Sequence, residues 1–594
     1  MRELEELILA RSVIGFDSEW CKHCSYYLAV AATPDGPLVF RDRAAAARFL
    51  SGLTKDDIIS AHYGRADWRA LGLYPYKATV FDSLTLGWLI DEEPPHGLKV
   101  RGPRFLERSF EDPITVREAT GETLFNGIHV AEATQSDVIR YCTADSQGSA
   151  DLTVHYLCKL PDELLSWYHN VEVPTDYVLY LCETRGIAVN EPLMEKETDA
   201  LRPEVEALAK RVYELVGYEF NINSGQQLGN VLYTETYEVT RRERQQVGLY
   251  KNGKPKMAFV EVPEPRNGLG LRAKKSTPSG APATDKEALL DHAGHPVIDA
   301  LLEYSTLSTA LNYLTSYPQF IRDGRIRGQF KQAGTVTGRL SSSEPNLQNI
   351  PRRGDLGKRI RKLFIAEPGN QLVVADLDQL EYRILAALSG EQKLIDAFVN
   401  GEDIHQRTAT IMGVSSRDVG KTGNYAAVYE CGPNKFAQLC TVAGQPTDVD
   451  QAKRLLEKYY EQLPMVLVWK TRVKNDAARQ GFVRTMGGRL RHLPDAVSKD
   501  HGLRARALRQ AVNSVIQGSA ADLVKLWMVL MQEQGIPMLA QIHDEVIVEV
   551  PAAEAEATGK VMVECLTEAA KRIGLTRVPM TTTPKIADTW GDAK

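Results

Sequence analysis

The 594-residue sequence has few of the features that would mark an exported or membrane-bound chain. Its eight Cys residues are too few for a disulfide framework, so a reducing compartment is the better prediction. No run of about 18 apolar residues occurs, and none is therefore expected to span a membrane. The acidic N-terminus lacks the long apolar stretch of a signal peptide. These absences predict a cytoplasmic protein that does not bind membranes.

Three further absences narrow the chemistry. No GxxxxGK[ST] loop occurs, so a P-loop ATPase has no support. Cys21 and Cys24 have metal-ligand spacing, but no second CxxC pair follows, and a four-ligand zinc site is therefore not expected. An overall excess of positive charge is also missing, because 71 Lys and Arg residues face 77 Asp and Glu residues, a net charge of −6. A uniformly basic nucleic-acid binder is excluded.

The composition that is present, 43% apolar and 25% charged residues, is that of a folded globular protein of about four structural units. Residues 1–160 alternate strand-like and helix-like runs, which predicts an α/β unit. Residues 162–216 and 402–480 have helical periodicity. Residues 536–550 indicate two strands that meet at a tight turn. Residues 235–284 are basic and rich in Gly and Pro, which predicts a long loop or a small β excursion.

Positive charge is concentrated in two segments. Residues 322–362 contain eleven Lys and Arg residues against three acids, and residues 241–275 contain ten against three. Such segments in an acidic protein indicate local grooves for anions. Solvated surface charge explains them equally well from composition alone.

Apolar runs that end in carboxylates are the first chemical feature. Asp376 follows one such run and Asp544 follows another. On adjacent strands, two carboxylates about 4 Å apart would repel by about 1 kcal/mol in water, and a divalent cation would remove that repulsion. Oxygen-rich sites suit Mg²⁺ or Mn²⁺, and two such ions can align the oxygens of a phosphoryl transfer. For either Asp alone, a simple cap at a strand end is the alternative.

The N-terminal part contains a second set of acids. Asp17 and Glu19 are two residues apart on an expected strand, so both point to one face. Asp67 and Asp145 could complete an acidic cluster, and Tyr141, one helical turn before Asp145, could orient a water. A cluster of this kind binds two metal ions and hydrolyses phosphodiesters.

A polar stripe marks one expected helix. Arg417, Lys421, Tyr425 and Tyr429 recur every four residues and would line one helical face. Two cations followed by two rings fit a ligand with a triphosphate at one end and a base at the other. The alternative is a solvated basic turn followed by two core tyrosines.

Six motifs in order, over about 200 residues, resemble DNA polymerase family A, the DNA polymerase I type. They are TGRLSSSEPNLQNIP (Thr337–Pro351), DLDQLEYR (Asp376–Arg383), GEDIHQRTA (Gly401–Ala409), RDVGKTGNYAAVY (Arg417–Tyr429), RQAVNSVIQGSAAD (Arg509–Asp522) and HDE (His543–Glu545). Upstream, FDSEW, AHYGRAD and YCTAD are similar to the DEDD-type 3′–5′ proofreading exonuclease of the same family.

The resemblance implies an α/β and α+β multidomain fold, in which a ribonuclease H-like exonuclease domain precedes a right-hand polymerase of palm, fingers and thumb. The implied domains are residues 1–165 (exonuclease), 166–330 (thumb, with a basic insertion near 235–284), 331–400 (first part of the palm), 401–485 (fingers) and 486–594 (second part of the palm). The length leaves no room for the 5′-nuclease domain of the full bacterial enzymes, so we expect a phage-type enzyme.

The resemblance also implies a role for each matching residue in polymerisation. Asp376, Asp544 and the Leu377 carbonyl would hold two Mg²⁺ or Mn²⁺ ions. Lys421 would protonate the leaving pyrophosphate, and Glu381 would reject ribonucleotides. The dNTP contacts would be Arg417, Lys421, Tyr425, Tyr429, His405, Glu381 and Gln379. The primer–template contacts would be Arg339, Asn346, Gln348, Asn349, Arg509, Asn513, Gln517 and His543.

In the exonuclease, the resemblance implies that Asp17, Glu19, Asp67 and Asp145 hold a second pair of metal ions beside the catalytic Tyr141. Tyr63 stands where the family usually has Asn, a departure that bears on the assignment of Asp67 but not on the fold. In the polymerase, Asp378 is an extra carboxylate that either alters metal preference or points to solvent.

Two further positions bear on the polymerase. Glu430 replaces the Gly that usually follows Tyr429. Tyr425 stands where many members have Phe, and in the family this Tyr goes with weak discrimination against dideoxynucleotides.

The leading hypothesis is therefore a proofreading DNA polymerase for phage genome replication in a bacterial host cytoplasm. Its partners would be primer–template DNA, dNTPs and, as candidates, a processivity factor, a helicase–primase or a single-strand-binding protein, with no membrane. A degradative or repair nuclease with a weak polymerase half is the second hypothesis. A non-catalytic DNA-binding scaffold is the third, and it predicts loss of Asp376 or Asp544, both of which are present.

Overall fold

The computed structural model describes residues 13–20, 27–106, 135–249, 255–277, 279–351 and 354–593. The chain divides into two compact units. Unit 1 comprises Met1–Val189, Phe320–Asn349 and Phe364–Lys594, and unit 2 comprises Asn190–Gln319 and Ile350–Leu363. The CxxC pair lies outside the described residues, and the domain boundaries expected from the family resemblance stay predictions.

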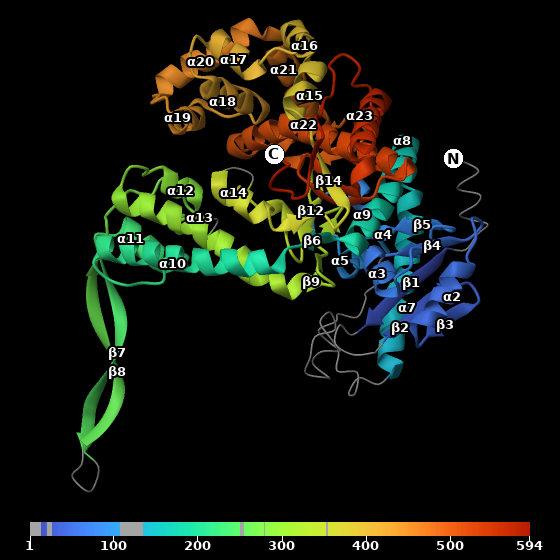
Figure 1. The fold of residues 1–594 in the computed structure, drawn as a ribbon, viewed down its shortest axis with the longest axis horizontal. Coiled ribbons are helices and arrows are strands. Elements are labelled where there is room, and N and C mark those ends of the chain that lie inside the picture. Colours follow the sequence, from blue (N-terminus) through green and yellow to red (C-terminus); the bar gives the residue numbers. More distant parts are fainter. Residues whose placement is uncertain are drawn as a thin grey trace. The chain divides into compact units, whose positions relative to one another are not determined.

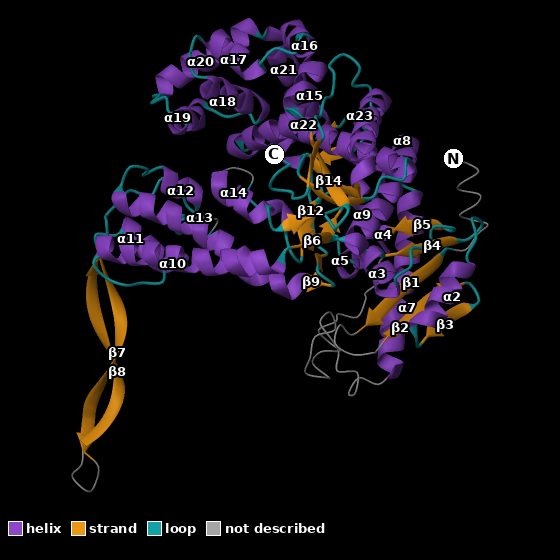
Figure 2. Ribbon diagram, viewed as in Figure 1, coloured by secondary structure: helices purple, strands orange, loops and turns teal. Residues whose placement is uncertain are grey.

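Unit 1 begins with a five-stranded sheet in the order β3-β2-β1-β4-β5 (Figures 1 and 2). The strands β1, β2 and β3 are antiparallel, whereas β4 and β5 run parallel to β1. The strands are β1 (Ile14–Trp20), β2 (Tyr27–Thr33), β3 (Gly36–Phe40), β4 (Ile58–Ala61) and β5 (Thr79–Asp82). The helices are α2 (Arg43–Gly52), α3 (Arg65–Leu71), α4 (Ser83–Ile90), α5 (Leu98–Leu106) and α7 (Gln135–Leu157). This arrangement confirms the predicted α/β unit.

This sheet has two apolar clusters. One contains Phe81 of β5, Leu86 of α4 and Leu152 of α7. The other contains Phe16 of β1 and Trp68 of α3, whose rings lie 5.4 Å apart. Since helix α7 packs against β1, β2 and β4, the acidic ends of these elements are held close together.

A helical connection leads from this sheet into the rest of unit 1. It consists of α8 (Asp162–Trp167), a π-helical turn (Tyr168–Glu172) and α9 (Val173–Arg185). A small antiparallel sheet follows, in the order β13-β6-β10-β9. Its strands are β6 (Ile187–Val189), β9 (Ile321–Arg322), β10 (Arg325–Ile326) and β13 (Phe364–Ile365). The hairpins are β11 (Gln329–Lys331) with β12 (Ser341–Ser343) and β15 (Phe482–Arg484) with β16 (Leu490–His492).

The centre of unit 1 is an antiparallel sheet in the order β17-β18-β14-β19. Its strands are β14 (Asn370–Asp376), β17 (Met538–Ile542), β18 (Glu545–Pro551) and β19 (Lys585–Ala587). Leu372–Ala375 of β14 are buried, as their continuous apolar run requires. The predicted strand before Asp376 and the predicted pair of strands in 536–550 are both confirmed.

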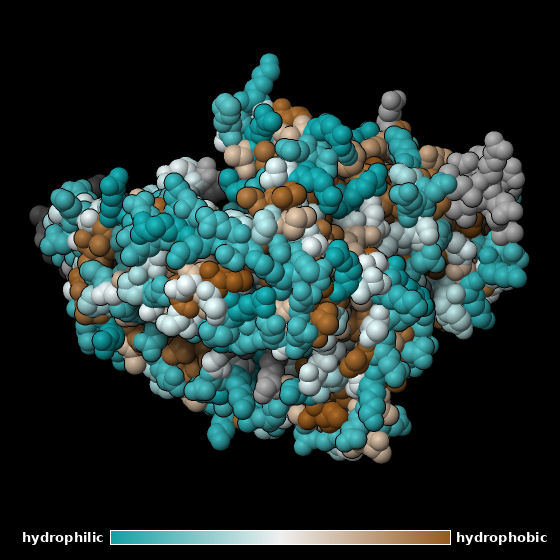
Figure 3. All heavy atoms as spheres, turned by 90° about the horizontal axis from the view of Figure 1, so that it is seen from above, coloured by the Kyte–Doolittle hydropathy of each residue, from teal (hydrophilic) through white to brown (hydrophobic). Residues whose placement is uncertain are grey.

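Two helices, α22 (His501–Glu533) and α23 (Ala555–Arg572), accompany this sheet. Helix α22 is long and apolar enough to cross a membrane by length and composition, but 94% of its most apolar stretch is buried inside the protein. Burial of this kind is typical of a core helix. On the face shown in Figure 3, hydrophilic side chains predominate and apolar ones form scattered patches.

Helices dominate residues 380–480 of unit 1, which confirms the helical prediction for 402–480 (Figure 2). They are α15 (Leu380–Ser389), α16 (Gln392–Val399), α17 (Ile404–Met412), α18 (Arg417–Val428), α19 (Pro433–Val442), α20 (Val449–Gln462) and α21 (Pro464–Gln480). Short 3₁₀ helices occur at Tyr317–Phe320, Leu347–Asn349, Pro494–Val497 and Ala552–Glu554.

Unit 2 is a helical body that carries one β-hairpin. Its helices are α10 (Glu191–Val216), α11 (Gly225–Tyr233), α12 (Lys286–Leu290), α13 (Pro296–Ser316) and α14 (Gly354–Arg361). The hairpin pairs β7 (Thr236–Leu249) with β8 (Pro255–Asn267). At its base, the hydroxyl of Tyr237 donates a hydrogen bond to that of Tyr218 at 3.0 Å. Of the two predictions for 235–284, the β excursion is therefore the one observed.

Candidate active site

The two carboxylates predicted to bind metal lie at the same end of the central sheet. Asp376 is the last residue of β14 and faces Glu545 of β18 in the strand register. The Leu377 amide donates a hydrogen bond to the Asp544 carbonyl oxygen at 3.0 Å. Strand pairing thus brings together two residues that are 168 positions apart in the sequence.

The third residue of the HDE motif lies outside this site. Glu545 is 1% exposed, and one of its carboxylate oxygens accepts a hydrogen bond from the Trp590 indole at 2.5 Å. His543, in the turn between β17 and β18, is exposed and has a left-handed backbone with φ of 60°. The turn therefore leaves His543 exposed and Asp544 half-buried, and it buries Glu545.

The donor set fits Mg²⁺ or Mn²⁺. Among the described residues, no group of three or more His, Cys, Asp or Glu side chains is arranged to hold a metal ion. Two carboxylates with a backbone carbonyl still fit Mg²⁺, because this ion often takes one or two carboxylates and completes its shell with water and substrate phosphates. Asp378 is exposed and accepts a hydrogen bond from the Thr581 hydroxyl at 3.1 Å.

Arg339, Glu381 and Tyr429 form a network beside Asp544. The Arg339 guanidinium pairs with the Glu381 carboxylate, which also hydrogen-bonds the Tyr429 side chain. Burial raises the pKa of Glu381 above its usual range, against the opposing effect of Arg339. Burial, reinforced by the Glu381 charge, also raises the pKa of Tyr429. Arg339, predicted as a DNA contact, is therefore tied to the residue predicted to exclude ribonucleotides.

Helix α18 displays the predicted polar stripe. Arg417 begins the helix after its N-cap Ser416, and Tyr429 is its C-cap residue. The rings of Tyr425 and Tyr429 are stacked, with centroids 5.4 Å apart and planes inclined by 9°. Tyr425 is 51% exposed, so the stripe is not a row of core tyrosines.

His405 of α17 lies beside this stripe as a neutral imidazole. Burial, followed by the charges of Arg417 and Lys421, lowers the pKa of His405 to about 4. The Asn424 amide is 2.9 Å from His405 Nδ1 and can donate to it, which leaves the proton on Nε2. Asp403, 2.6 Å from Arg417, caps the start of α17. Sequence reasoning missed Asn424 and Asp403, because neither belongs to the four-residue repeat.

Two glycines let α18 pack closely on α17. A Cβ at Gly420 would lie 2.1 Å from the His405 carbonyl oxygen. A Cβ at Gly423 would lie 2.6 Å from the Met412 sulfur. Close packing at these glycines holds His405 next to the cationic half of the stripe.

The other residues predicted to contact DNA or dNTP lie either on helix α22 or in turns outside it. Arg509, Asn513 and Gln517 lie one turn apart on α22, with Arg509 exposed and Asn513 Oδ1 buried without a hydrogen-bond partner. Gln348 donates to the Gln541 side chain at 3.2 Å.

The remaining three lie on turns. Asn346 Oδ1 accepts a hydrogen bond from the backbone N–H of Gln348 at 3.0 Å, and Asn349 is exposed. Gln379 is the N-cap of α15, with φ of 52° and a buried, unpartnered Oε1. A hollow is lined by Arg339, Gln541, His543 and Asp544, and Gln348 reaches its lining through the hydrogen bond to Gln541.

The four N-terminal carboxylates also come together. Asp17 and Glu19 lie on β1, Asp67 on α3 and Asp145 on α7. The Ser18 amide and hydroxyl both donate to Asp67 Oδ1, at 3.0 and 2.5 Å. Burial and then the Asp145 charge raise the pKa of Asp17 to about 7. Burial and the Asp17 charge raise the pKa of both Glu19 and Asp67.

These four described carboxylates are likewise not arranged as a ready-made group of metal ligands, but their oxygen-only chemistry suits a divalent cation. Asp17 Oδ2 is buried without a hydrogen-bond partner, so a cation there would satisfy an atom that the chain leaves unpaired. Sequence reasoning missed Lys99 of α5, whose ammonium pairs with Asp145 and lies 4.1 Å from the centre of the Tyr141 ring. Tyr63, at the position of the usual Asn, has φ of 63° and lies under the Arg65 guanidinium.

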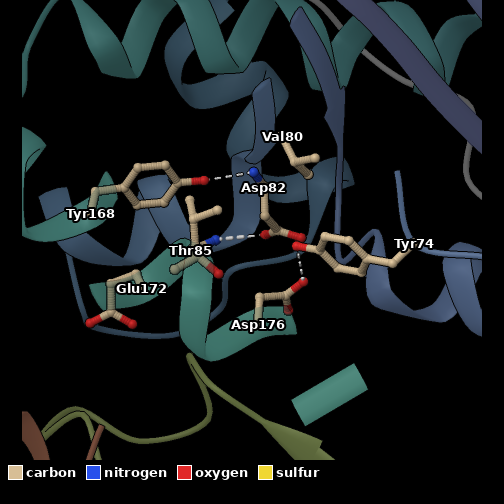
Figure 4. A pocket seen from close by; sticks show the side chains of 8 residues that line it. Tyr74, Val80, Asp82, Thr85, Tyr168, Glu172 and Asp176 are labelled. Atoms are coloured by element: carbon tan, nitrogen blue, oxygen red, sulfur yellow. Dashed lines mark hydrogen bonds between the residues drawn. The ribbon is translucent and has the colours of Figure 1, made fainter. Parts of the chain in front are cut away.

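A polar pocket lies between β5, α4 and α9, and its lining includes none of the residues of the two carboxylate sets (Figure 4). In it the Tyr74 hydroxyl donates to Asp176 at 3.3 Å, and the Asp82 amide donates to the Tyr168 hydroxyl at 2.8 Å. Glu172, also in its lining, pairs with Lys525 of α22 at 2.8 Å. This buried ion pair joins the helical connection to the central part of unit 1.

Comparisons with known proteins identify relatives of this chain by sequence. Residues 266–592, which include all six motifs, match the family model of DNA polymerase family A. The thermostable DNA polymerase I of Thermus filiformis is 35% identical over 451 residues, covering 73% of this chain and 49% of that protein. DNA polymerase I of Chloroflexus aurantiacus is 31% identical over 501 residues, covering 81% and 49%. The chain thus spans about half the length of the curated relatives it matches.

A solved structure is similar over almost the whole chain. It is the POL domain of Pol1 from M. smegmatis in complex with DNA primer–template and dNTP. The TM-score is 0.79 at 25% sequence identity, and the match covers 99% of this chain and 97% of that one. The N-terminal sheet is therefore included in the structural similarity.

Proposed function

This chain belongs to DNA polymerase family A, and on that premise we propose that it adds dNTPs to the 3′ end of a primer under the direction of a DNA template. The observation that carries the proposal is the pairing of β14 with β18, which sets Asp376 beside the Asp544 turn. The stripe on α18 and the Arg339–Glu381–Tyr429 network lend further support, because they supply groups for a triphosphate, a base and a sugar.

We assign each predicted residue of the polymerase site a task in this reaction. Asp376, Asp544 and the Leu377 carbonyl would hold Mg²⁺. Bound there, Mg²⁺ would favour ionisation of the primer 3′-hydroxyl and offset charge on the departing pyrophosphate. Arg417 and Lys421 would bind the phosphates, and Lys421 would donate a proton to the leaving group.

The remaining groups would select the nucleotide. The neutral His405 would donate a hydrogen bond from Nε2 to a phosphate oxygen. Tyr425 would stack near the base. Glu381, held by Arg339 and Tyr429, would crowd the 2′ position of the sugar. Base pairing itself supplies the sequence information.

Primer extension with Mg²⁺ and dNTPs tests this proposal. We expect Asp376→Ala and Asp544→Ala to reduce extension to background. Asp378→Asn is the matched control, because Asp378 is exposed and hydrogen-bonded to Thr581. Extension by Asp544→Ala at the wild-type rate, or equal loss in the control, would refute the assignment.

We further propose that the N-terminal carboxylates hydrolyse the primer from its 3′ end. The support is their convergence from β1, α3 and α7 and the orphaned oxygen of Asp17. Asp17→Ala is expected to abolish 3′ degradation in the absence of dNTPs while extension continues. Degradation that persists in Asp17→Ala would locate the hydrolytic centre elsewhere.

A role in phage genome replication is also a proposal, supported by the family pattern at Tyr425. Tyr425 predicts weak discrimination against dideoxynucleotides. Competition between dideoxy-GTP and dGTP during primer extension measures this discrimination. The hypothesis of a nuclease with a weak polymerase half drew on Asp378 and Glu430. The contacts made by these two carboxylates weaken that support, because Asp378 accepts a hydrogen bond from Thr581 and Glu430 forms ion pairs with two lysines.

A further inference from the structure

The residue that follows the stripe of α18 combines two costly features. Glu430 has φ of 54°, a left-handed conformation that side chains other than Gly rarely adopt. Its side chain is only 9% exposed. A buried carboxylate in this conformation persists only where other groups compensate for it.

Two lysines of α21 provide that compensation. Lys470 Nζ lies 2.7 Å from Glu430 Oε1, and the Lys474 ammonium pairs with Oε2. Burial alone would raise the pKa of Glu430, but Lys470, with help from Lys474, holds it below its usual range. Glu430 is therefore an anion at neutral pH.

Lys470 also reaches the end of α18 directly. Its ammonium donates to the Ala427 carbonyl oxygen and, at 3.0 Å, to the Tyr460 hydroxyl of α20. The last carbonyls of a helix have no partner within it, and a cation there is favoured by the helix dipole. Glu430 and Lys470 thus fasten the C-terminal end of α18 to α20 and α21.

The fastened end carries the nucleotide-selecting side chains. Tyr429 immediately precedes Glu430, stacks on Tyr425 and hydrogen-bonds Glu381. A change in the backbone direction at Glu430 would tilt Tyr429 and shift its hydrogen bond to Glu381.

We propose that Glu430, Lys470 and Lys474 form a lock, called here the α18 lock, that positions Tyr429 for nucleotide selection. This inference rests on the proposed polymerase function. We assign these three residues a positioning role, because their contacts hold the end of α18 and act on the nucleotide only through Tyr429 and Glu381.

Binding of the correct dNTP to the full-length protein on a dideoxy-terminated primer–template tests the lock without any chemical step. The variants are Glu430→Gly, Lys470→Met and the two combined. Gly accepts the left-handed backbone, so Glu430→Gly removes the carboxylate without adding strain. Arg479→Met is the matched control, because Arg479 also lies on α21 but forms an exposed pair with Asp476.

We expect Glu430→Gly to raise the Kd and the KM for dNTP by roughly tenfold, since a misplacement of about 1 Å can cost on the order of 100-fold. Incorporation of ribonucleotides relative to deoxynucleotides should rise, whereas kcat at saturating dNTP should change less. The double variant should recover thermal stability, because no unpaired charge stays buried, yet keep the raised Kd.

A purely structural ion pair would give a different pattern. Values of Kd, KM and ribonucleotide rejection within about twofold of Arg479→Met would overturn the lock, as would a double variant that recovers binding together with stability. Loss of primer extension in the wild type would instead refute the proposed function itself, and the lock with it.

Discussion

The substitution Asp522→Asn should destabilise unit 1 strongly, although Asp522 touches neither carboxylate set. Asp522 is 0% exposed and its Oδ1 lies 2.5 Å from Arg489 Nε. Arg489 also donates to the carbonyl oxygens of Thr337 and Gly518, both at 3.0 Å. Its guanidinium therefore supports the segment that leads to Arg339.

The expected magnitude follows from the burial of both partners. Removal of one member of a buried pair leaves an uncompensated charge and costs about 3–5 kcal/mol. With an m value of about 3 kcal/mol per M urea, a loss near 4 kcal/mol lowers the midpoint of unfolding by slightly more than 1 M. Primer extension should weaken as well, since the Thr337 segment loses its support.

Urea unfolding followed by tryptophan fluorescence measures this effect. Glu568→Gln, which breaks the exposed pair with Arg572 on α23, is the control and should leave the urea midpoint nearly unchanged, because solvent screens an exposed pair. Replacement of both buried partners, Asp522→Leu with Arg489→Met, should recover much of the loss. A midpoint for Asp522→Asn indistinguishable from that of the control would refute the reasoning.

Three further predictions concern the candidate sites. Gly420→Ala should cost about 1–3 kcal/mol and weaken dNTP binding, because its Cβ would meet the His405 carbonyl; unfolding and binding measurements that match the wild type would contradict this. The KM for dNTP should show no titration of His405 between pH 5.5 and 8, since its pKa is about 4; an inflection in this range that His405→Gln removes would argue against a neutral imidazole. Asp17 has a folded pKa of about 7, above its ordinary value, so the metal-free protein should lose stability as the pH rises from about 4 through 7. In EDTA at pH 8, Asp17→Asn should then stabilise the protein by on the order of 1–3 kcal/mol, whereas an unchanged urea midpoint would contradict burial of that charge.

Local patterns in the sequence were sufficient to predict several elements. The apolar run of Leu372–Ala375 predicts a buried strand that ends at Asp376, and the structure has that strand as β14. The four-residue spacing from Arg417 to Tyr429 predicts one helical face, as found on α18. Both features depend on a few neighbouring residues, so short windows of sequence contain the information.

Other parts of the site depended on contacts that no local pattern contains. HDE reads as three similar polar residues, yet Asp544 lies in the turn that accepts a hydrogen bond from Leu377, while Glu545 is buried against Trp590. Glu430 stood out only as a departure from the family pattern, and its partners Lys470 and Lys474 lie 40 and 44 positions away in the sequence. Nothing near Lys99 indicated that it would lie beside Asp145.

The division between these two kinds of feature has a physical cause. Helical and strand periodicity reflects which side chains within one element share a face, so the sequence alone determined the strand before Asp376 and the stripe of α18. Whether a charge is buried, and which charge compensates for it, depends on elements brought together by chain folding. Only the tertiary structure could therefore decide that Arg339 pairs with Glu381 and that Lys470 holds Glu430.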